Sequence, residues 1–256
     1  MSLLKLNNCT IRFGGLTAVD SLDTFVAHNE LVGMIGPNGA GKTTVFNIIT
    51  GVYDPTEGDV IFNDESLVHY KPFQVTLKGI ARTFQNIRLY QSMTVKDNVR
   101  VSYNNTCKSK LFKSVIQIGN FSKEEKQFSD EIDELLNMFG LYELADEYAK
   151  NLPYGEQRKL EIVRALATKP KLLLLDEPAA GTNPTEKRAL MNLIQEIKDK
   201  FKISILLVEH DMSVVMGVCE RIFVLDYGKK IAEGKPEEIQ KDSRVIEAYL
   251  GVEVKK

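Results

Sequence analysis

Short apolar runs alternate with amphipathic stretches along most of this chain. Three of the runs are apolar almost throughout, at residues 31–35, 172–175 and 204–208. Such runs are typical of strands that are buried on both faces of a parallel sheet. Each run is followed, directly or after a loop, by a stretch of helical character, at residues 45–51, 185–201 and 214–219. This alternation predicts an α/β domain with a parallel sheet at its centre.

The two ends of the chain show strands without helices between them. Residues 3–13 alternate apolar and polar side chains, and a second strand is expected at about 22–27. A further short strand is expected at 59–62, after a turn rich in Asp, Pro and Gly. Near the C-terminus, a Tyr-Gly turn separates two strands of a predicted hairpin, at residues 221–226 and 229–232.

Residues 86–153 differ from the rest because they contain no convincing strand. A helix is expected at 94–103 and a long amphipathic helix at 121–140, where apolar residues recur at helical spacing. Residues 108–122 are irregular and basic. We interpret this part as a helical subdomain inserted into a single domain. The expected division is a core of residues 1–92 and 154–256 and an insertion of residues 93–153.

Composition excludes several classes of protein. The chain has 256 residues with 43% hydrophobic and 27% charged residues, which is ordinary for a soluble globular protein. The net charge of −2 indicates that nucleic acid is not its main partner. Its three cysteines are far apart, which argues against a disulfide framework or a zinc site. The sequence shows no signal peptide and no apolar run long enough to span a bilayer.

The stretch GPNGAGKTT fits the phosphate-binding pattern GxxxxGK[ST] at Gly36, Gly41, Lys42 and Thr43. It lies between a predicted strand and a predicted helix, which is the context that the pattern requires. Glycines let successive N–H groups point at a polyphosphate, and the start of the helix adds its dipole. Lys42 is expected to reach the outer phosphates and Thr43 to ligate magnesium. The predicted nucleotide contacts here are Gly36, Pro37, Asn38, Gly39, Ala40, Gly41, Lys42, Thr43 and Thr44.

Polar residues follow three of the predicted strands. Asp176 and Glu177 end the leucine-rich strand, His210 follows the next one, and Gln85 follows the apolar Ile80 and Phe84. Ligands bind at the carboxyl ends of strands in open α/β sheets. We therefore predict a nucleotide-hydrolysing site. The alternatives are surface acids at a strand end, a structural histidine and a solvated loop glutamine.

Each of these residues has an expected role. Asp176 would hold Mg²⁺ together with Thr43, and Glu177 would be the general base for the attacking water. Gln85 would contact the metal or the water, and His210 would hold the γ-phosphate. Lys42 completes the predicted catalytic set.

Two further positions carry weaker predictions. Phe13 ends the first strand ahead of the phosphate loop, where an aromatic ring can stack on adenine; a core or edge phenylalanine is the alternative. Residues 152–157 open a helix expected at 158–167, and small and polar residues at a helix start can present N–H groups to an anion. A simple helix cap explains the same residues.

Taken in order, these segments resemble a known family over nearly the whole chain. GPNGAGKTT, Gln85, LPYGEQRKLEIVRAL, LLLLDEP and Glu209-His210-Asp211 resemble the Walker A, Q-loop, signature, Walker B and H-loop motifs of ABC transporter ATPases. GIARTFQNIRLY, DEPAAGTNP and LDYGKKIAEGKPEEIQ resemble the LivG-type ATPases of high-affinity branched-chain amino acid importers. The resemblance implies a P-loop NTPase fold with a mainly parallel RecA-like core, an antiparallel N-terminal β subdomain and an inserted α-helical subdomain.

The resemblance also implies an activity and partners. The cofactors would be ATP and Mg²⁺, with each nucleotide between one subunit's phosphate loop and the signature helix of a second ABC ATPase subunit. That second subunit would be another copy or, as this type favours, a related ATPase. Two transmembrane permease subunits would dock near residues 86–95, on the cytoplasmic face of the inner membrane. An extracytoplasmic substrate-binding protein would take part indirectly.

The chain departs from the family's usual motifs at two places. Where the common signature reads LSGGQ, this chain has Pro153 for the serine, followed by Tyr154, Gly155 and Glu156. The serine contact to the γ-phosphate is therefore absent, and the expected signature-side nucleotide contacts are Tyr154, Gly155 and Glu156. Asn183 stands where most members have aspartate.

Three alternative functions remain at this point. The same ATPase could serve another cargo, such as urea, short amides or an envelope lipid. A soluble ABC ATPase of translation or DNA repair is disfavoured because the chain shows no second ATPase domain, coiled coil or basic extension. A regulator without turnover is disfavoured because Glu177 and His210 are both in place.

Overall fold

The computed structural model describes residues 2–104 and 121–250. They form two compact units, one up to Arg82 and again from Lys171 onward, and the other from Thr83 to Pro170. Most of the stretch 108–122, expected to be irregular, lies outside the described residues. No helix in the described part of the chain is long and apolar enough to cross a membrane.

The first unit contains an antiparallel sheet with the strand order β2-β1-β4-β5. β1 (Ser2–Phe13) and β2 (Leu16–Ala27) form a hairpin, while β4 (Glu57–Phe62) pairs with β1 and with the short β5 (Glu65–Ser66). The antiparallel N-terminal part is thus confirmed. β2 begins earlier than the expected residue 22, because pairing with β1 continues up to the turn, where Phe13 lies opposite Leu16.

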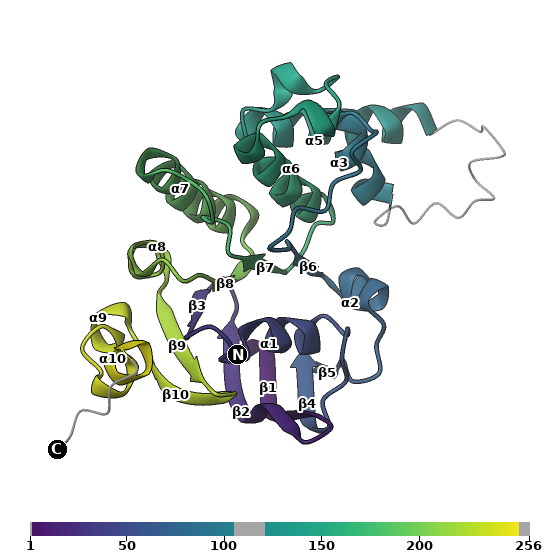
Figure 1. The fold of residues 1–256 in the computed structure, drawn as a ribbon. Coiled ribbons are helices and arrows are strands. Elements are labelled where there is room, and N and C mark those ends of the chain that lie inside the picture. The colour runs from purple at the N-terminus through teal and green to yellow at the C-terminus, as the bar shows by residue number, and fades with distance from the viewer. Residues whose placement is uncertain (1, 105–120, 251–256) are drawn as a thin grey trace. The chain divides into compact units, whose positions relative to one another are not determined.

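A second sheet in the same unit has the order β10-β9-β3-β8-β7-β6 (Figure 1). All its neighbours are parallel except the hairpin of β9 and β10. The expected mainly parallel core is therefore confirmed. Its strands are β3 (Leu31–Ile35), β6 (Ile80–Arg82), β7 (Leu172–Asp176), β8 (Ser204–Val208), β9 (Arg221–Asp226) and β10 (Lys229–Gly234).

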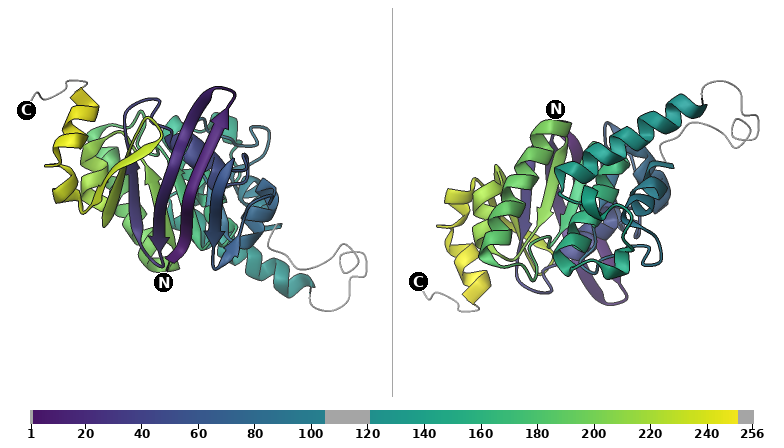
Figure 2. Two further views of the ribbon diagram at one scale, coloured as in Figure 1. Left: turned by 90° about the horizontal axis from the view of Figure 1, so that it is seen from below. Right: turned by 90° about the horizontal axis from the view of Figure 1, so that it is seen from above.

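Helix α1 (Lys42–Ile49) lies between the two sheets, where Val45, Phe46 and Ile49 join one hydrophobic cluster with residues of both (Figure 1). The other face of the parallel sheet is also covered: a side chain at Gly33 would come within 3.0 Å of Val215 in α8 (Met212–Val218). The yellow C-terminal helices lie beside the β9–β10 hairpin (Figure 2). The remaining helices of this unit are α2 (Pro72–Lys78), α7 (Pro184–Phe201), α8 (Met212–Val218), α9 (Pro236–Ile239) and α10 (Ser243–Leu250).

In its described residues, the regular secondary structure of the second unit is helical, apart from one isolated bridge between Thr94 and Tyr148. The unit extends to both sides of the expected insertion 93–153. The reason is that α6 (Tyr154–Ala167) packs against α3 (Val95–Asn104), and side chains of α6 bind the backbone at residues 84–88. α6 therefore belongs to this compact unit. Its helices are α3 (Val95–Asn104), α5 (Phe121–Met138) and α6 (Tyr154–Ala167), with 3-10 turns at Tyr142–Leu144 and Ala149–Asn151.

A substitution at Leu174 tests the packing of the six-stranded, mainly parallel sheet. Leu174 lies in β7, is fully buried and belongs to the core cluster. Leu174→Ala should lower the free energy of unfolding by about 2–5 kcal/mol, because the cavity cannot collapse in a strand paired on both edges. Urea unfolding followed by circular dichroism measures this. Leu77→Ala is the matched control: Leu77 is 64% exposed, so an equal loss there would contradict the assignment of the core.

Candidate functional site

The phosphate loop connects β3 to α1, so the predicted order of strand, loop and helix is confirmed. The glycines at both ends of the loop are required by close packing. A β-carbon at Gly36 would lie 2.1 Å from the carbonyl oxygen of Leu225, and one at Gly41 would lie 2.7 Å from that of Ala18. Gly41 also has a φ of 102°, which favours glycine. Only glycine allows the loop to pass this close to its neighbours.

Lys42 is the first residue of α1 and is buried. Its Nζ donates hydrogen bonds to the carbonyl oxygens of Gly36 at 2.7 Å and Pro37 at 3.0 Å. Burial lowers the pKa of the ammonium group, and the negative charges of Glu177 and Asp176 oppose that shift. The ammonium group is therefore held against the inside of the loop, close to the two acids at the end of β7.

Asp176 is buried at the end of β7 and is paired with a residue that the sequence analysis missed. Arg82, at the end of β6, places one guanidinium nitrogen 2.9 Å from Asp176 Oδ2. Its other terminal nitrogen donates to Asn47 Oδ1 of α1 at 2.7 Å, and the group lies over the ring of Phe46. An arginine at the end of a short apolar strand was the available signal, because a charge there needs a buried partner.

Glu177 and His210 lie close together, just beyond the ends of the neighbouring strands β7 and β8. Glu177 has a φ of 48°, and its N–H donates to the carbonyl oxygen of Val208 at 2.8 Å. This bond continues the pairing of β7 and β8 beyond their last pair, Asp176 and Val208. His210 Nδ1 lies 3.7 Å from Glu177 Oε2, and 59% of the His210 side chain is exposed. A solvated imidazole thus lies beside the proposed base.

Glu209 is fully buried between these residues and was also missed. One carboxylate oxygen accepts the N–H of Ala179 at 2.7 Å, and the other accepts the N–H of His210 at 3.2 Å. Burial raises the pKa of Glu209, while hydrogen bonds from the backbone and the charge of His210 oppose the shift. Glu209 thereby ties the loop after β7 to the loop after β8. An acid directly after an apolar strand was the signal.

Gln85, Tyr154, Gly155 and Glu156 belong to the second unit and are described within it. Gln85 is exposed. α6 begins at Tyr154 rather than near 158, so Tyr154, Gly155 and Glu156 form its first turn, whose N–H groups lack partners within the helix. Pro153 at the N-cap makes no capping hydrogen bond through its side chain. The turn can therefore present N–H groups to an anion.

Two other predicted positions have clear surroundings. Phe13 ends β1, is 42% exposed and packs edge-on against Tyr53, with the ring centroids 5.1 Å apart. A position in the core is thus excluded, and an edge or a stacking role remains. Asn183 caps α7 by accepting the N–H groups of Thr185 and Glu186, a role that its carboxamide performs as well as an aspartate does.

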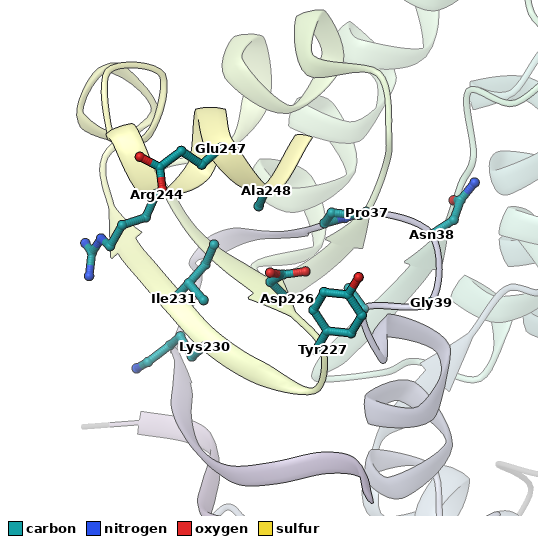
Figure 3. A pocket seen from close by; sticks show the side chains of 11 residues that line it. Pro37, Asn38, Gly39, Asp226, Tyr227, Lys230, Ile231, Arg244, Glu247 and Ala248 are labelled. Atoms are coloured by element: carbon teal, nitrogen blue, oxygen red, sulfur yellow. The ribbon is translucent and has the colours of Figure 1, made fainter. Parts of the chain in front are cut away.

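A cavity of about 780 Å³ lies where the phosphate loop faces the C-terminal part of the chain. Pro37, Asn38 and Gly39 line it from the loop, opposite the β9–β10 hairpin and α10 (Figure 3). Burial raises the pKa of the hydroxyl of Tyr249 in α10, and the backbone of Gly36 opposes that shift. The C-terminal hairpin and helix therefore form the wall of this cavity that faces the loop.

The donor groups fit a magnesium ion. Thr43 in the first turn of α1 offers a hydroxyl and Asp176 a carboxylate, and Mg²⁺ prefers oxygen ligands and needs few from the protein when phosphates are present. Within residues 2–104 and 121–250, no group of three or more His, Cys, Asp or Glu side chains could hold a metal ion by itself.

Comparisons with known proteins agree with this geometry. A family model described as ABC transporter matches residues 19–180, and one described as branched-chain amino acid ATP-binding cassette transporter matches residues 229–255. The high-affinity branched-chain amino acid transport ATP-binding protein LivG of Escherichia coli is 44% identical over 97% of this chain and 98% of its own. The lipopolysaccharide export system ATP-binding protein LptB of Escherichia coli is 32% identical over 98% of both chains.

The fold also matches a solved structure, the ADP conformation of MJ1267, an ATP-binding cassette of an ABC transporter. The TM-score is 0.84 and the identity 30%, over 98% of this chain and all of that chain.

The pair of Arg82 and Asp176 provides a test. Arg82→Ala should lower the free energy of unfolding by about 3–5 kcal/mol, because it removes the guanidinium partner of a buried carboxylate. Chemical denaturation measures the change. Arg12→Ala is the control, since the Arg12–Glu57 pair is 42% and 55% exposed and should contribute less than about 1 kcal/mol. Equal losses in the two variants would contradict a special role for the buried pair.

Proposed function

The chain belongs to the ABC transporter family and carries its nucleotide-binding ATPase domain, and we propose that it powers an importer for branched-chain or similar amino acids. Two findings support this assignment of the cargo. Residues 229–255 match the branched-chain amino acid model, and LivG is 44% identical over nearly the whole chain. The cargo never touches this subunit in such a system, so the subfamily resemblance is the evidence for it.

ATP binding is assigned to the phosphate loop and its neighbours. Backbone N–H groups of residues 36–44 would surround the β- and γ-phosphates, and Lys42 would exchange its carbonyl partners for phosphate oxygens. Phe13 would stack on the adenine ring, which its exposure allows. Thr43 and Asp176 would hold Mg²⁺, which neutralises charge on the phosphates when bound.

Hydrolysis is assigned to the carboxylate after β7. Glu177 would accept a proton from water as the water oxygen bonds to the γ-phosphorus, while the bond from that phosphorus to the β,γ-bridging oxygen breaks. His210, 3.7 Å from Glu177, would bind the γ-phosphate. Gln85 would contact the metal or the water. The backbone bonds from Glu177 to Val208 and from Ala179 to Glu209 support a preorganised position for the base.

A second ATPase subunit would complete each site. In the proposed head-to-tail pair, the first turn of α6 on one subunit faces the nucleotide on the other through Tyr154, Gly155 and Glu156. The exposure of Tyr154 supports this contact. Pairing and opening would then follow ATP binding and hydrolysis.

The subunit would act at the membrane without entering it. Two permease subunits would contact residues 86–95 at the cytoplasmic face, and an extracytoplasmic protein would deliver the amino acid. The alternative cargo with a specific observation behind it is an envelope lipid, since LptB is also similar over the whole length. The lower identity, 32% against 44%, favours the amino acid.

Glu177→Gln tests the chemistry. The amide cannot accept the proton, so the turnover number should fall roughly 10²–10⁴-fold, the usual contribution of a general base, while ATP affinity is retained. Phosphate release and fluorescent ATP binding measure the two quantities, and gel filtration with ATP should show a trapped dimer. Lys42→Ala should instead weaken ATP binding. Turnover at the normal rate in Glu177→Gln would remove Glu177 as the base.

Gentle purification of the tagged chain from its native membranes tests the assembly. Two permease subunits and a second ATPase should copurify, and the reconstituted complex with its extracytoplasmic protein should take up radiolabelled leucine in an ATP-dependent manner. Copurification with lipid-export components would replace the amino acid with a lipid. Recovery with ribosomes or DNA, free of membrane subunits, would contradict the transporter and leave the ATPase activity standing.

A further inference from the structure

Arg158 in the second turn of α6 joins two segments that the proposed function treats separately. One guanidinium nitrogen donates both to the hydroxyl of Tyr154 at 2.8 Å and to the carbonyl oxygen of Gln85 at 3.0 Å. The other terminal nitrogen donates to the carbonyl oxygen of Phe84 at 2.8 Å. The residue is only 4% exposed. The rigid guanidinium group of Arg158 thus contacts both the loop around Gln85, here called the Gln85 loop, and Tyr154 at the start of α6.

Glu161, one turn later on the same helix, accepts hydrogen bonds from the same loop to which Arg158 donates. Its Oε1 accepts the N–H groups of Phe84 at 3.3 Å and Arg88 at 3.2 Å, and its Oε2 lies 3.3 Å from Arg158. Glu161 is 5% exposed. Carbonyl groups of the loop are therefore held by Arg158 and N–H groups by Glu161, so the backbone at residues 84–88 cannot shift without disturbing this buried pair.

The next residues of the loop are attached as well. Arg164 of α6 donates to the carbonyl oxygen of Arg88 and lies over the ring of Tyr90, 4.8 Å from its centroid. The backbone of Tyr90 exchanges two hydrogen bonds with the side chain of Asn98 in α3, at 2.9 and 3.0 Å. The segment 84–90 is thus connected to both α6 and α3 by polar side chains.

The same helix contains a useful contrast. Lys159 and Glu156 form an ion pair at 3.0 Å, with side chains that are 39% and 28% exposed. Neither contacts the loop through a hydrogen bond that the structure records. A pair that served only to stabilise α6 would resemble this one. The buried side chains of Arg158 and Glu161 instead form hydrogen bonds with the backbone of residues 84–88.

We propose that Arg158 is a positioning residue that couples the Gln85 loop to Tyr154, so that displacement of residues 84–90 by a membrane subunit reorients the signature end of α6. This rests on the proposed function, in which a permease contacts residues 86–95. The planar guanidinium is suited to this role because it presents several donors in a fixed fork. Lysine, with a single ammonium on a flexible stem, cannot hold both partners in one geometry.

The test compares ATPase rates of the assembled transporter in proteoliposomes with those of the chain alone. In the wild type, membrane subunits should stimulate hydrolysis. Arg158→Lys should lower the ratio of stimulated to basal rate about five- to tenfold, the size of a typical coupling between sites. The KM for ATP should stay within about twofold, because the phosphate loop is unchanged. Lys169→Met, which breaks the partly exposed pair of Lys169 with Glu131 in the same unit, should leave the ratio as it is.

Tyr154→Phe provides a second, independent variant. It removes only the hydroxyl that Arg158 contacts and should also lower the ratio. Combined with Arg158→Lys, it should cause little further loss, since the two changes break one connection. If Arg158→Lys unfolds the chain, seen as a lowered melting temperature, the Tyr154→Phe ratio alone decides.

The outcomes separate the inference from the function on which it rests. A wild-type ratio in Arg158→Lys or in Tyr154→Phe, or fully additive losses in the double variant, would overturn the coupling. Absence of any stimulation of the wild-type chain by copurified membrane subunits would instead contradict the proposed transport function.

Discussion

The pairing of Arg82 with Asp176 is the interaction on which the rest of the proposed site depends. Two adjacent acids at the end of a strand buried on both faces would be costly without a positive partner. Arg82 supplies that partner at 2.9 Å and at the same time binds Asn47 in α1. The end of β6, the end of β7 and the helix behind the phosphate loop are therefore held by one guanidinium group.

Two buried carboxylates hold the loops of the proposed site in place in a similar way. Glu209 and Glu161 are buried acids whose oxygens accept backbone N–H groups from segments distant in sequence. Since each carboxylate would be destabilised without these bonds, the loop and the acid fix each other. In the first unit this orders the loops of Glu177 and His210, and in the second it orders the loop of Gln85. Residues assigned to catalysis are thus mobile only as far as these buried partners allow.

Elements with strong periodicity were predicted well, and those defined by pairing or packing were not. The strand at 204–208 matches β8 because five buried positions in a row leave little choice. β2 begins before its expected start because its first residues are held by pairing with β1 rather than by an apolar pattern. α6 begins at Tyr154 rather than at the expected residue 158, because the N–H of Gln157 donates to the carbonyl oxygen of Pro153 and so closes a first helical turn there.

The sequence by itself determined the phosphate loop, the two acids at the end of β7 and the histidine after β8, since each carries its chemistry in adjacent residues at fixed spacing. It also indicated the family, from the order of those motifs. Only the tertiary structure decided the partners of these residues. Arg82 reaches Asp176, and Arg158 reaches Gln85, across separations of 94 and 73 residues. Contacts of that range arise where the chain folds back on itself, and no local pattern encodes which buried donor will meet which acceptor.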